Sequence, residues 1–386
     1  MNTGRILANR LRHAALGLLT GLSALLLGGV PAVAAGQSME AIHVLTPGAG
    51  SVRGPLVPGP DGHLYGNLVG PRSASSVFRL GSDGVFSVLP LSSAVSPGAN
   101  GLTLGPDGWL YGTTFEGGAY GQGTLYRVST EGRLERLHSF NAPTDGGKPN
   151  NRLMLASDGY FYGATAVGGP SNEGTVFRFS PGGGFNLVHA FDSEVDGTRA
   201  PRGPITEGSD GMLYATGSGG DHNGGTVFKM KRSGGGLTVL HAFWFDGRDG
   251  YGPGSGVVEG PDGRFYGVAN GHRLNRHGVV FRLERDGHLE VLFNFPKAKV
   301  DGREPFHRLA RGRDGALYGS TAWGGPYTLS GTLFRVTTDG IVTTLHQFDP
   351  DLPVGGPAGN ELVETADGEF MGATSDSIFR WRLGVR

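Results

Sequence analysis

Short apolar segments separated by Gly, Pro and Asp follow one another along most of this chain. Each segment is rich in Val, Leu, Phe, Tyr and Thr, and the residues that bound it are those that favour turns. Outside residues 14–30, no segment keeps the helical spacing of apolar residues over ten positions. The pattern therefore predicts an all-β protein made of many short strands.

These segments form an internal repeat with a period near 50 residues. Its most regular motif is Asp-Gly, any residue, Leu or Phe, an aromatic residue and Gly. The motif occurs seven times, starting at Asp61, Asp107, Asp158, Asp210, Asp262, Asp314 and Asp367. Two copies depart from it, with Ala215 in place of the last Gly and Met371 in place of the aromatic residue.

Three further features complete each repeat. A segment of the type Gly-Thr-Val/Leu-Phe/Tyr-Arg/Lys follows the first motif, then a Leu-His-x-Phe segment, then a longer loop that is often Asp-Gly-x-x-Pro. Asp-Gly between strands favours two-residue hairpin turns, in which both central residues have φ above zero. Each repeat is therefore predicted to be four antiparallel strands joined by two tight turns and two longer loops. Seven such repeats predict a seven-bladed β-propeller.

The two ends of the repeat array share one blade in this prediction. The seventh repeat stops after its third strand, near residues 379–383, and lacks a Leu-His strand. A displaced copy of that strand, residues 42–45, precedes the first repeat. We expect the N-terminal strand to complete the last blade, because closing the ring removes the exposed strand edges of an open array.

The first residues are typical of a secretory signal peptide. Arg5, Arg10 and Arg12 precede an uncharged apolar run over residues 14–30, and small residues follow it at 32–35. The run is at the short end for a spanning helix, which needs about 20 residues, and an uncleaved anchor is the alternative. We expect a signal peptide over residues 1–35, a propeller over 36–386, and a secreted or periplasmic mature protein. The lack of Cys excludes disulfides, thiolate metal sites and a lipoprotein anchor.

Composition and charge narrow the classes of partner. The 72 Gly and 23 Pro recur with the repeat, which distinguishes the chain from a disordered one. The 33 basic and 34 acidic residues balance, so no global field attracts the protein to nucleic acid or to anionic lipid. No Gly-x-Ser-x-Gly, His-Glu-x-x-His or P-loop sequence occurs. We expect no nucleic-acid partner, no membrane association after signal cleavage, no cofactor, and a monomer.

Together the motifs resemble the Gloeobacter/Verrucomicrobium tandem repeat, often shortened to GloVer. The resemblance is carried by residues 107–114 (DGWLYGTT), 123–127 (GTLYR) and 137–140 (LHSF), and it covers about residues 40–382. It implies the seven-bladed propeller fold. Some seven-bladed ulvan lyases carry similar repeats, and this weaker resemblance implies cleavage of rhamnose–glucuronate polysaccharides by β-elimination.

Residues that recur in every blade are interpreted as structural. The Tyr of the first motif is assigned to the core, and the histidines of the Leu-His strand to the outermost strand. The basic residue that closes the third strand is expected to form an interblade ion pair or cap; it is Arg79, Arg127, Arg178, Lys229, Arg282, Arg335 or Arg380. Four loop aspartates are expected to bond nearby backbone rather than calcium; they are Asp145, Asp196, Asp249 and Asp301.

The fifth repeat departs most from the others, in the loop between its second and third strands. It has His272, Arg273 and His277 where other repeats have small residues, and Tyr251 lies in the preceding interblade loop. These loops share the long-loop face, where binding residues concentrate. We predict that His272 or His277 is a general base, Tyr251 the acid, and Arg273 the partner of a substrate carboxylate. Substrate-binding residues are predicted to be His222, Arg303, His307, Trp323, Tyr327 and Tyr120.

The sequence leaves three functions open. The first is a secreted propeller that acts on uronate-containing polysaccharide, as a β-eliminating lyase. The second is a non-catalytic glycan-binding module with an aromatic shelf, and the third is an envelope or matrix scaffold with an apolar patch for protein. A solvated basic rim without specific function is the alternative for the fifth-repeat loop. His222, His272 and His277 lack the carboxylate spacing of a metal site, so we predict no metal.

Overall fold

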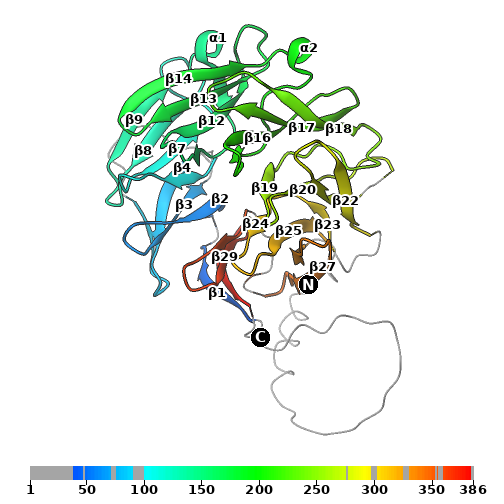
Figure 1. The fold of residues 1–386 in the computed structure, drawn as a ribbon. Coiled ribbons are helices and arrows are strands. Elements are labelled where there is room, and N and C mark those ends of the chain that lie inside the picture. Colours follow the sequence, from blue (N-terminus) through cyan, green and yellow to red (C-terminus); the bar gives the residue numbers. More distant parts are fainter. Residues whose placement is uncertain are drawn as a thin grey trace, which may run out of the picture. The chain divides into compact units, whose positions relative to one another are not determined.

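The computed structural model describes residues 38–46, 48–70, 75–89, 100–274, 277–296, 302–324, 330–352, 354 and 360–383. Seven antiparallel sheets of four or five strands make up this part of the chain. They stand in sequence order around a ring, each as one blade (Figure 1). The prediction of an all-β, seven-bladed propeller is confirmed. The predicted signal peptide, residues 1–35, lies outside the described residues.

The inner two strands of each blade come from the interblade loop and the Leu-Tyr-Gly segment. The innermost strands are β2 (Ser51–Pro58), β6 (Leu102–Leu104), β10 (Gly147–Pro149) with β11 (Met154–Leu155), β15 (Thr206–Glu207), β19 (Val257–Glu259), β23 (Arg303–Pro305) with β24 (Ala310–Arg311), and β28 (Val363–Glu364). The second strands are β3 (Leu64–Val69), β7 (Leu110–Thr114), β12 (Phe161–Val167), β16 (Met212–Gly217), β20 (Phe265–Ala269), β25 (Leu317–Trp323) and β29 (Phe370–Ala373).

The outer two strands come from the Phe-Arg and Leu-His segments. The third strands are β4 (Ser75–Leu80), β8 (Thr124–Val128), β13 (Thr175–Ser180), β17 (Asn223–Lys231), β21 (Val279–Leu283), β26 (Thr332–Val336) and β30 (Ser377–Arg382). The outermost strands are β5 (Phe86–Val88), β9 (Leu134–Ser139), β14 (Gly183–Ala190), β18 (Thr238–Trp244), β22 (Leu289–Asn294), β27 (Val342–Gln347) and β1 (Ser38–Val44). Two single-turn helices, α1 (Ala142–Asp145) and α2 (Ser193–Asp196), lie in interblade loops.

The N-terminal strand closes the ring as predicted. The last sheet has the order β1-β30-β29-β28, so the first strand of the described chain is the outermost strand of the seventh blade. It pairs antiparallel with β30, from Ser38 opposite Arg382 to Val44 opposite Ser377, with one bulge. The buried Leu45 follows, and its N–H donates to the carbonyl of Asp376 at 2.7 Å.

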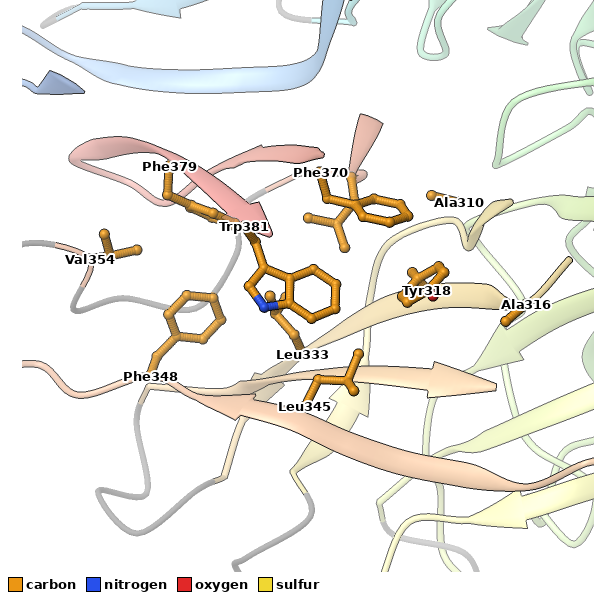
Figure 2. Packing of buried hydrophobic residues seen from close by; sticks show 11 residues of the cluster. Ala310, Ala316, Tyr318, Leu333, Leu345, Phe348, Val354, Phe370, Phe379 and Trp381 are labelled. Atoms are coloured by element: carbon orange, nitrogen blue, oxygen red, sulfur yellow. The ribbon is translucent and has the colours of Figure 1, made fainter. Parts of the chain in front are cut away.

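The hydrophobic core lies in the seams between successive blades. In the seam of the sixth and seventh blades, Trp381 is 1% exposed and packs with Tyr318, Leu345 and Phe348 (Figure 2). The other clusters likewise join side chains from neighbouring blades, for example Tyr214 with Phe265. Each blade is too thin to bury its own faces, so the ring is stable only as a stack of neighbours.

The conserved spacing within each repeat has a steric cause at the second glycine of the motif. Gly66 of β3 lies opposite Phe78 of β4, and a Cβ on Gly66 would approach the Phe78 ring tip to 2.5 Å. The same pairing of Gly with an aromatic residue occurs in five other blades. In the fourth blade Ala215 lies opposite Phe228, so the space next to that ring accommodates one methyl group.

Substitution of Gly66 by Ala is expected to destabilise the protein by about 1–3 kcal/mol, because the added methyl overpacks the ring of Phe78. The control is Gly182→Ala, where no atom lies within 4 Å of the added Cβ, and where we expect a change of at most about 0.5 kcal/mol. Urea denaturation of both variants measures the difference. Equal stability of the two variants would contradict the steric account.

In six of the seven blades, the Asp of the Leu-Tyr-Gly motif bonds the Tyr four residues later. The Tyr111 hydroxyl donates to the Asp107 carboxylate at 2.7 Å, and five more blades repeat the bond at 2.7–2.9 Å. Burial of the ring, opposed by Arg127 and reinforced by Asp107, raises the pKa of Tyr111 to about 12. This pair explains why Asp and Tyr recur together in the motif.

The predicted turn type is wrong. The Gly59 N–H donates to the His63 carbonyl at 2.8 Å, so the loop between these residues has three residues, not two. Gly62 has a φ of 80°, whereas the φ of Asp61 is not positive. This is the three-residue hairpin in which a type I turn precedes a left-handed residue. In this turn the Asp61 side chain accepts the His63 N–H and the Tyr65 hydroxyl.

The basic residues that close the third strands are structural, as predicted, but in two ways. Arg127 forms ion pairs within its own blade, at 3.3 Å to Asp107 and 2.8 Å to Glu135. Lys229 and Arg282 donate to backbone carbonyls of the next blade, at 3.0 and 2.9 Å, and Arg282 also pairs with Glu290 in its own blade. The interblade role therefore holds for only part of the set.

The histidines of the outer strands bond the loop aspartates. His138, His189 and His241 lie 2.7–2.9 Å from the carboxylates of Asp145, Asp196 and Asp249 respectively. Each Asp also accepts a backbone N–H from its own loop, for example Asp145 from Asn141 at 2.6 Å. The predicted turn role of these three residues is confirmed, and Asp301 lies outside the described residues.

Candidate functional site

Two hollows adjoin on the long-loop face of the propeller. The first, of about 440 Å³, is lined by Tyr251 and is called the Tyr251 hollow. The second, of about 400 Å³, lies where the innermost strands begin around the axis and is called the axial hollow. The two share Gly254, Ser255 and Phe306 as lining residues, so they form one continuous depression.

An aromatic cluster from the fourth and fifth blades borders the Tyr251 hollow. The Tyr251 and His272 rings stack with centroids 4.6 Å apart, and Phe245 lies 4.8 Å from His272. The Arg273 guanidinium lies 5.0 Å from the centre of the Phe245 ring. Tyr251 is held in place by its backbone N–H, which donates to the Asn270 carbonyl at 2.9 Å.

The His272 ring adds a polar atom to this aromatic cluster. Its Nε2 is buried and has no hydrogen bond to any residue that the structure describes. A buried nitrogen without a partner costs about 1–3 kcal/mol, and His272 adjoins the hollow through its contact with the Tyr251 ring rather than as a lining residue. Arg202, Asn223 and Asn270 supply the polar atoms of the same hollow.

The structure brings three of the four predicted catalytic residues together. Tyr251, His272 and Arg273 surround Phe245. His277 lies at the junction with the sixth blade, where its carbonyl accepts the N–H of Glu304 at 2.8 Å. The geometry therefore makes His272, rather than His277, the candidate base next to Tyr251.

The predicted substrate-binding residues are spread over the face. His222 stacks on Trp244 at 3.5 Å, and its carbonyl accepts the Phe245 N–H, so it extends the aromatic cluster. His307 lines the axial hollow. Trp323 donates from Nε1 to Glu304 at 3.0 Å, and Arg303 pairs with it in the sheet.

The residues predicted for an aromatic shelf lie in different blades where the structure describes them. Tyr120 is 59% exposed in the second blade and Trp323 lies in the sixth, while Tyr327 is outside the described residues. The aromatic cluster around Tyr251 contains two further exposed rings, Trp244 and Phe245, which are 38% and 41% exposed. They directly follow Phe243, the Phe of the Leu-His-x-Phe segment in the fourth repeat.

A charged trio from three blades lines the axial hollow. Glu361 Oε1 accepts from Arg152 at 3.1 Å and from Arg308 at 3.3 Å. Arg308 also donates to the Val257 carbonyl at 3.2 Å and to Thr206 at 2.9 Å. Desolvation lowers the pKa of Arg308, and Glu361 opposes this shift.

The described residues that line the axial hollow are mostly polar, and together they carry excess positive charge. Arg53, Arg152 and Arg308 line it with a single carboxylate, that of Glu361, which leaves two positive charges in excess. Amides also line it; they are Asn100, Asn150, Asn151 and Asn360. Three of these amides bond backbone carbonyls of a neighbouring blade, at 2.6–3.2 Å, and so hold the mouth rigid.

Sequence comparison between repeats contains the signal for this site. The residue just before the inner-strand apolar position is small or Pro in four blades, namely Pro55, Gly101, Pro204 and Gly256. It is Arg152, Arg308 and Glu361 in the other three. Because this position points to the axis in every blade, its three charged departures meet although they are far apart in sequence.

The fold and its repeats define a β-propeller of seven four-stranded blades. The chain belongs to the family described by the Gloeobacter/Verrucomicrobia repeat, whose model matches residues 51–272 and 196–378. No curated protein matches it. In the described part of the chain, no helix is long and apolar enough to cross a membrane, and no three His, Asp or Glu side chains are grouped to hold a metal ion.

Several solved structures share the fold at low identity. A streptogramin B lyase is 15% identical, with a TM-score of 0.63 over 90% of this chain and 98% of that one. Virginiamycin B lyase from Staphylococcus aureus is 16% identical, with a TM-score of 0.62 over 90% and 99%. The extracellular domain of a protein described as a hybrid two-component system, from B. thetaiotaomicron, is 13% identical, with a TM-score of 0.61 over 90% and 40%. At these identities the likeness concerns the fold alone.

Proposed function

We propose that the protein is an extracellular propeller that binds an acidic, uronate-containing oligosaccharide on its long-loop face. The observation that carries the proposal is the axial hollow, in which three arginines and one glutamate leave excess positive charge. Arginine binds carboxylates through two parallel hydrogen bonds, and Arg152 uses only Nη2 in its bond to Glu361 among the described residues. Its remaining donors can bind a uronate carboxylate.

The adjoining Tyr251 hollow offers an aromatic ring and hydrogen-bonding groups to the sugar residues next to that carboxylate. Tyr251 has an apolar ring for the C–H face of a sugar and a hydroxyl for its oxygens. Arg202, Asn223 and Asn270 add polar groups at the same wall. Concave sites with a few convergent polar groups and aromatic walls are typical of ligand-binding sites. A chain of several sugar residues can therefore contact both hollows at once.

The extracellular location rests on the predicted signal peptide over residues 1–35. It agrees with one solved structure of the same fold, which is the extracellular domain of a B. thetaiotaomicron protein. The absence of Cys also fits a mature chain that needs no disulfide for export.

Tyr251→Ala and Arg202→Ala are each expected to weaken binding of a uronate oligosaccharide by roughly 10- to 100-fold, since buried Tyr and Arg contacts dominate binding energies. Isothermal titration calorimetry measures the change. His288→Ala is the matched control, because His288 is exposed on the tight-turn face, and its affinity is expected to equal that of the parent. Unchanged affinity in both hollow variants would overturn the proposed site.

Cleavage by β-elimination is the second candidate function, and one observation favours it. His272, with a buried Nε2 that has no hydrogen bond in the described structure, stacks on Tyr251, which itself lines the hollow. In this function His272 takes the C5 proton of the uronate, Tyr251 protonates the leaving oxygen, and an arginine neutralises the carboxylate. The product carries a new C4–C5 double bond.

Ultraviolet absorbance of that double bond tests cleavage separately from binding. A lyase loses about 10²- to 10⁴-fold in rate on loss of its base, so His272→Ala is expected to abolish the absorbance increase and His277→Ala to leave it. Binding of the oligosaccharide without any absorbance increase in the parent would exclude cleavage and retain the binding function.

A further inference from the structure

A third hollow lies on the opposite, tight-turn face, in the seam where the seventh blade meets the first. Its volume is about 420 Å³, and it is called the seam hollow. Its apolar walls come from Ile42, Leu64, Leu80 and Met371. Its polar end is formed by Thr365, Asp367, Glu369 and Arg380. None of these residues belongs to the site of the proposed function.

A tyrosine fills the corresponding space in the other six blades. Tyr214 stacks on Phe265 of the next blade at 3.8 Å, and Tyr318 packs on Phe370 at 4.4 Å. All six of these tyrosines are at most 1% exposed; they are Tyr65, Tyr111, Tyr162, Tyr214, Tyr266 and Tyr318. Each hydroxyl donates to the motif aspartate at 2.7–2.9 Å.

The seventh blade has Met371 at this position. Met371 lies opposite Arg380 in the sheet, as Tyr318 lies opposite Arg335, so the two side chains start from equivalent places. Methionine has no ring and no hydroxyl. The seam hollow is therefore the space that a tyrosine would occupy.

Two further replacements enlarge the same seam. Pro58 of the first blade stands where the fourth and fifth blades have Glu207 and Glu259, which bond turn serines of the preceding blade. Ser82 stands where the fifth blade has Arg285, which donates to Glu259 and Ser209. Smaller residues at all three positions leave one seam open.

The polar partners of the missing tyrosine remain in place. In the sixth blade, Arg335 Nε donates to Asp314 at 3.2 Å and to the Tyr318 hydroxyl at 3.4 Å. In the seventh, Arg380 Nη1 donates to Glu369 at 3.3 Å and Nε lies 3.7 Å from Glu40 as an ion pair, but the buried Nε makes no hydrogen bond within the described structure. Asp367 accepts the Thr365 hydroxyl at 2.5 Å and keeps its second carboxylate oxygen for another donor.

We propose that the seam hollow is a binding site for a small phenol. The aromatic ring lies between Met371 and Leu64, where the tyrosine ring lies in the other seams. Its hydroxyl donates to Asp367 and accepts from Arg380 Nε, which restores the arrangement of Asp314, Tyr318 and Arg335. The ligand class follows from the repeat itself, since six seams of the same molecule bind a phenol that is part of the chain.

The probe is p-cresol, with toluene as the analogue that lacks only the hydroxyl. Titration of the mature protein by calorimetry is expected to give one p-cresol site. We expect toluene to bind at least about tenfold more weakly, because toluene leaves the buried donor Arg380 Nε without an acceptor. No p-cresol binding, or equal binding of the two compounds, would overturn the proposal.

Met371→Tyr fills the hollow from within. This variant is expected to lose p-cresol binding and to melt at a higher temperature than the parent, whereas Met371→Leu keeps binding. Asp367→Ala leaves the hollow open and removes the acceptor, so p-cresol affinity is expected to fall to that of toluene. Retained p-cresol affinity in Met371→Tyr or in Asp367→Ala contradicts the proposal. Uronate binding on the opposite face is expected to stay unchanged in all three variants, which separates this test from that of the proposed function.

Discussion

Deletion of residues 36–46 from the mature chain is expected to destabilise the propeller by on the order of 5 kcal/mol or more. The deletion removes the buried Leu45 and the whole ladder between β1 and β30. A buried Leu contributes about 1.5–3 kcal/mol and each ladder hydrogen bond about 0.5–1.5 kcal/mol. The deletion also removes the partly buried Met39 and Ala41 from the core cluster around Trp381.

Such a loss is comparable to the whole stability of many domains, about 5–15 kcal/mol. We therefore expect most of the truncated protein to be unfolded or aggregated through its exposed β30 edge. Urea denaturation followed by circular dichroism measures this. A synthetic peptide of residues 36–46, added in trans, is expected to restore part of the stability, and a truncated protein as stable as the parent would show that β1 is dispensable.

Replacement of Glu361 by Ala is expected to lower the free energy of unfolding by about 3–5 kcal/mol, because it leaves two arginines in the axial hollow without their shared carboxylate. Side chains of the trio are only 12–25% exposed, so water replaces the lost partner poorly. The control is Glu290→Ala, whose ion pair with Arg282 is half exposed, and for which about 0–1 kcal/mol is expected.

Chemical denaturation of both variants, with circular dichroism to confirm the fold in water, measures the contrast. Arg152→Met is expected to cost less than Glu361→Ala, since Glu361 keeps Arg308 as a partner. If Glu361→Ala costs no more than Glu290→Ala, the trio contributes no more than a surface ion pair.

The fold could be predicted from the sequence because its period is explicit. Seven Asp-Gly motifs fix the number of blades, and the displaced strand at residues 42–45 fixes how the ring closes. The turn type was predicted wrongly, because Asp-Gly also fits a three-residue hairpin, in which the Asp keeps an ordinary φ and only the Gly has a positive one. The seventh blade forms the same turn with Met371 in place of the tyrosine, so the bond from Asp to Tyr is not what selects it.

The site could be predicted only in part, because loops of different blades converge in ways that one repeat does not reveal. Departures from the repeat led to Tyr251, His272 and Arg273, whose side chains the structure brings together around Phe245. The axial trio was missed because its three departures lie in different repeats, and only the ring closure brings them together. The seam hollow likewise follows from Met371, which the sequence marks as an imperfect copy without showing what the missing ring leaves behind.

The central claim is that the long-loop face binds a uronate chain through its carboxylates. Calorimetry with a uronate tetrasaccharide and with the same tetrasaccharide after reduction of its carboxyl groups tests this most directly. The account predicts binding of the acidic form, weakened by rising salt because ions screen exposed charges, and little or no binding of the reduced form. Equal affinity for both forms, or no binding of either, would contradict it.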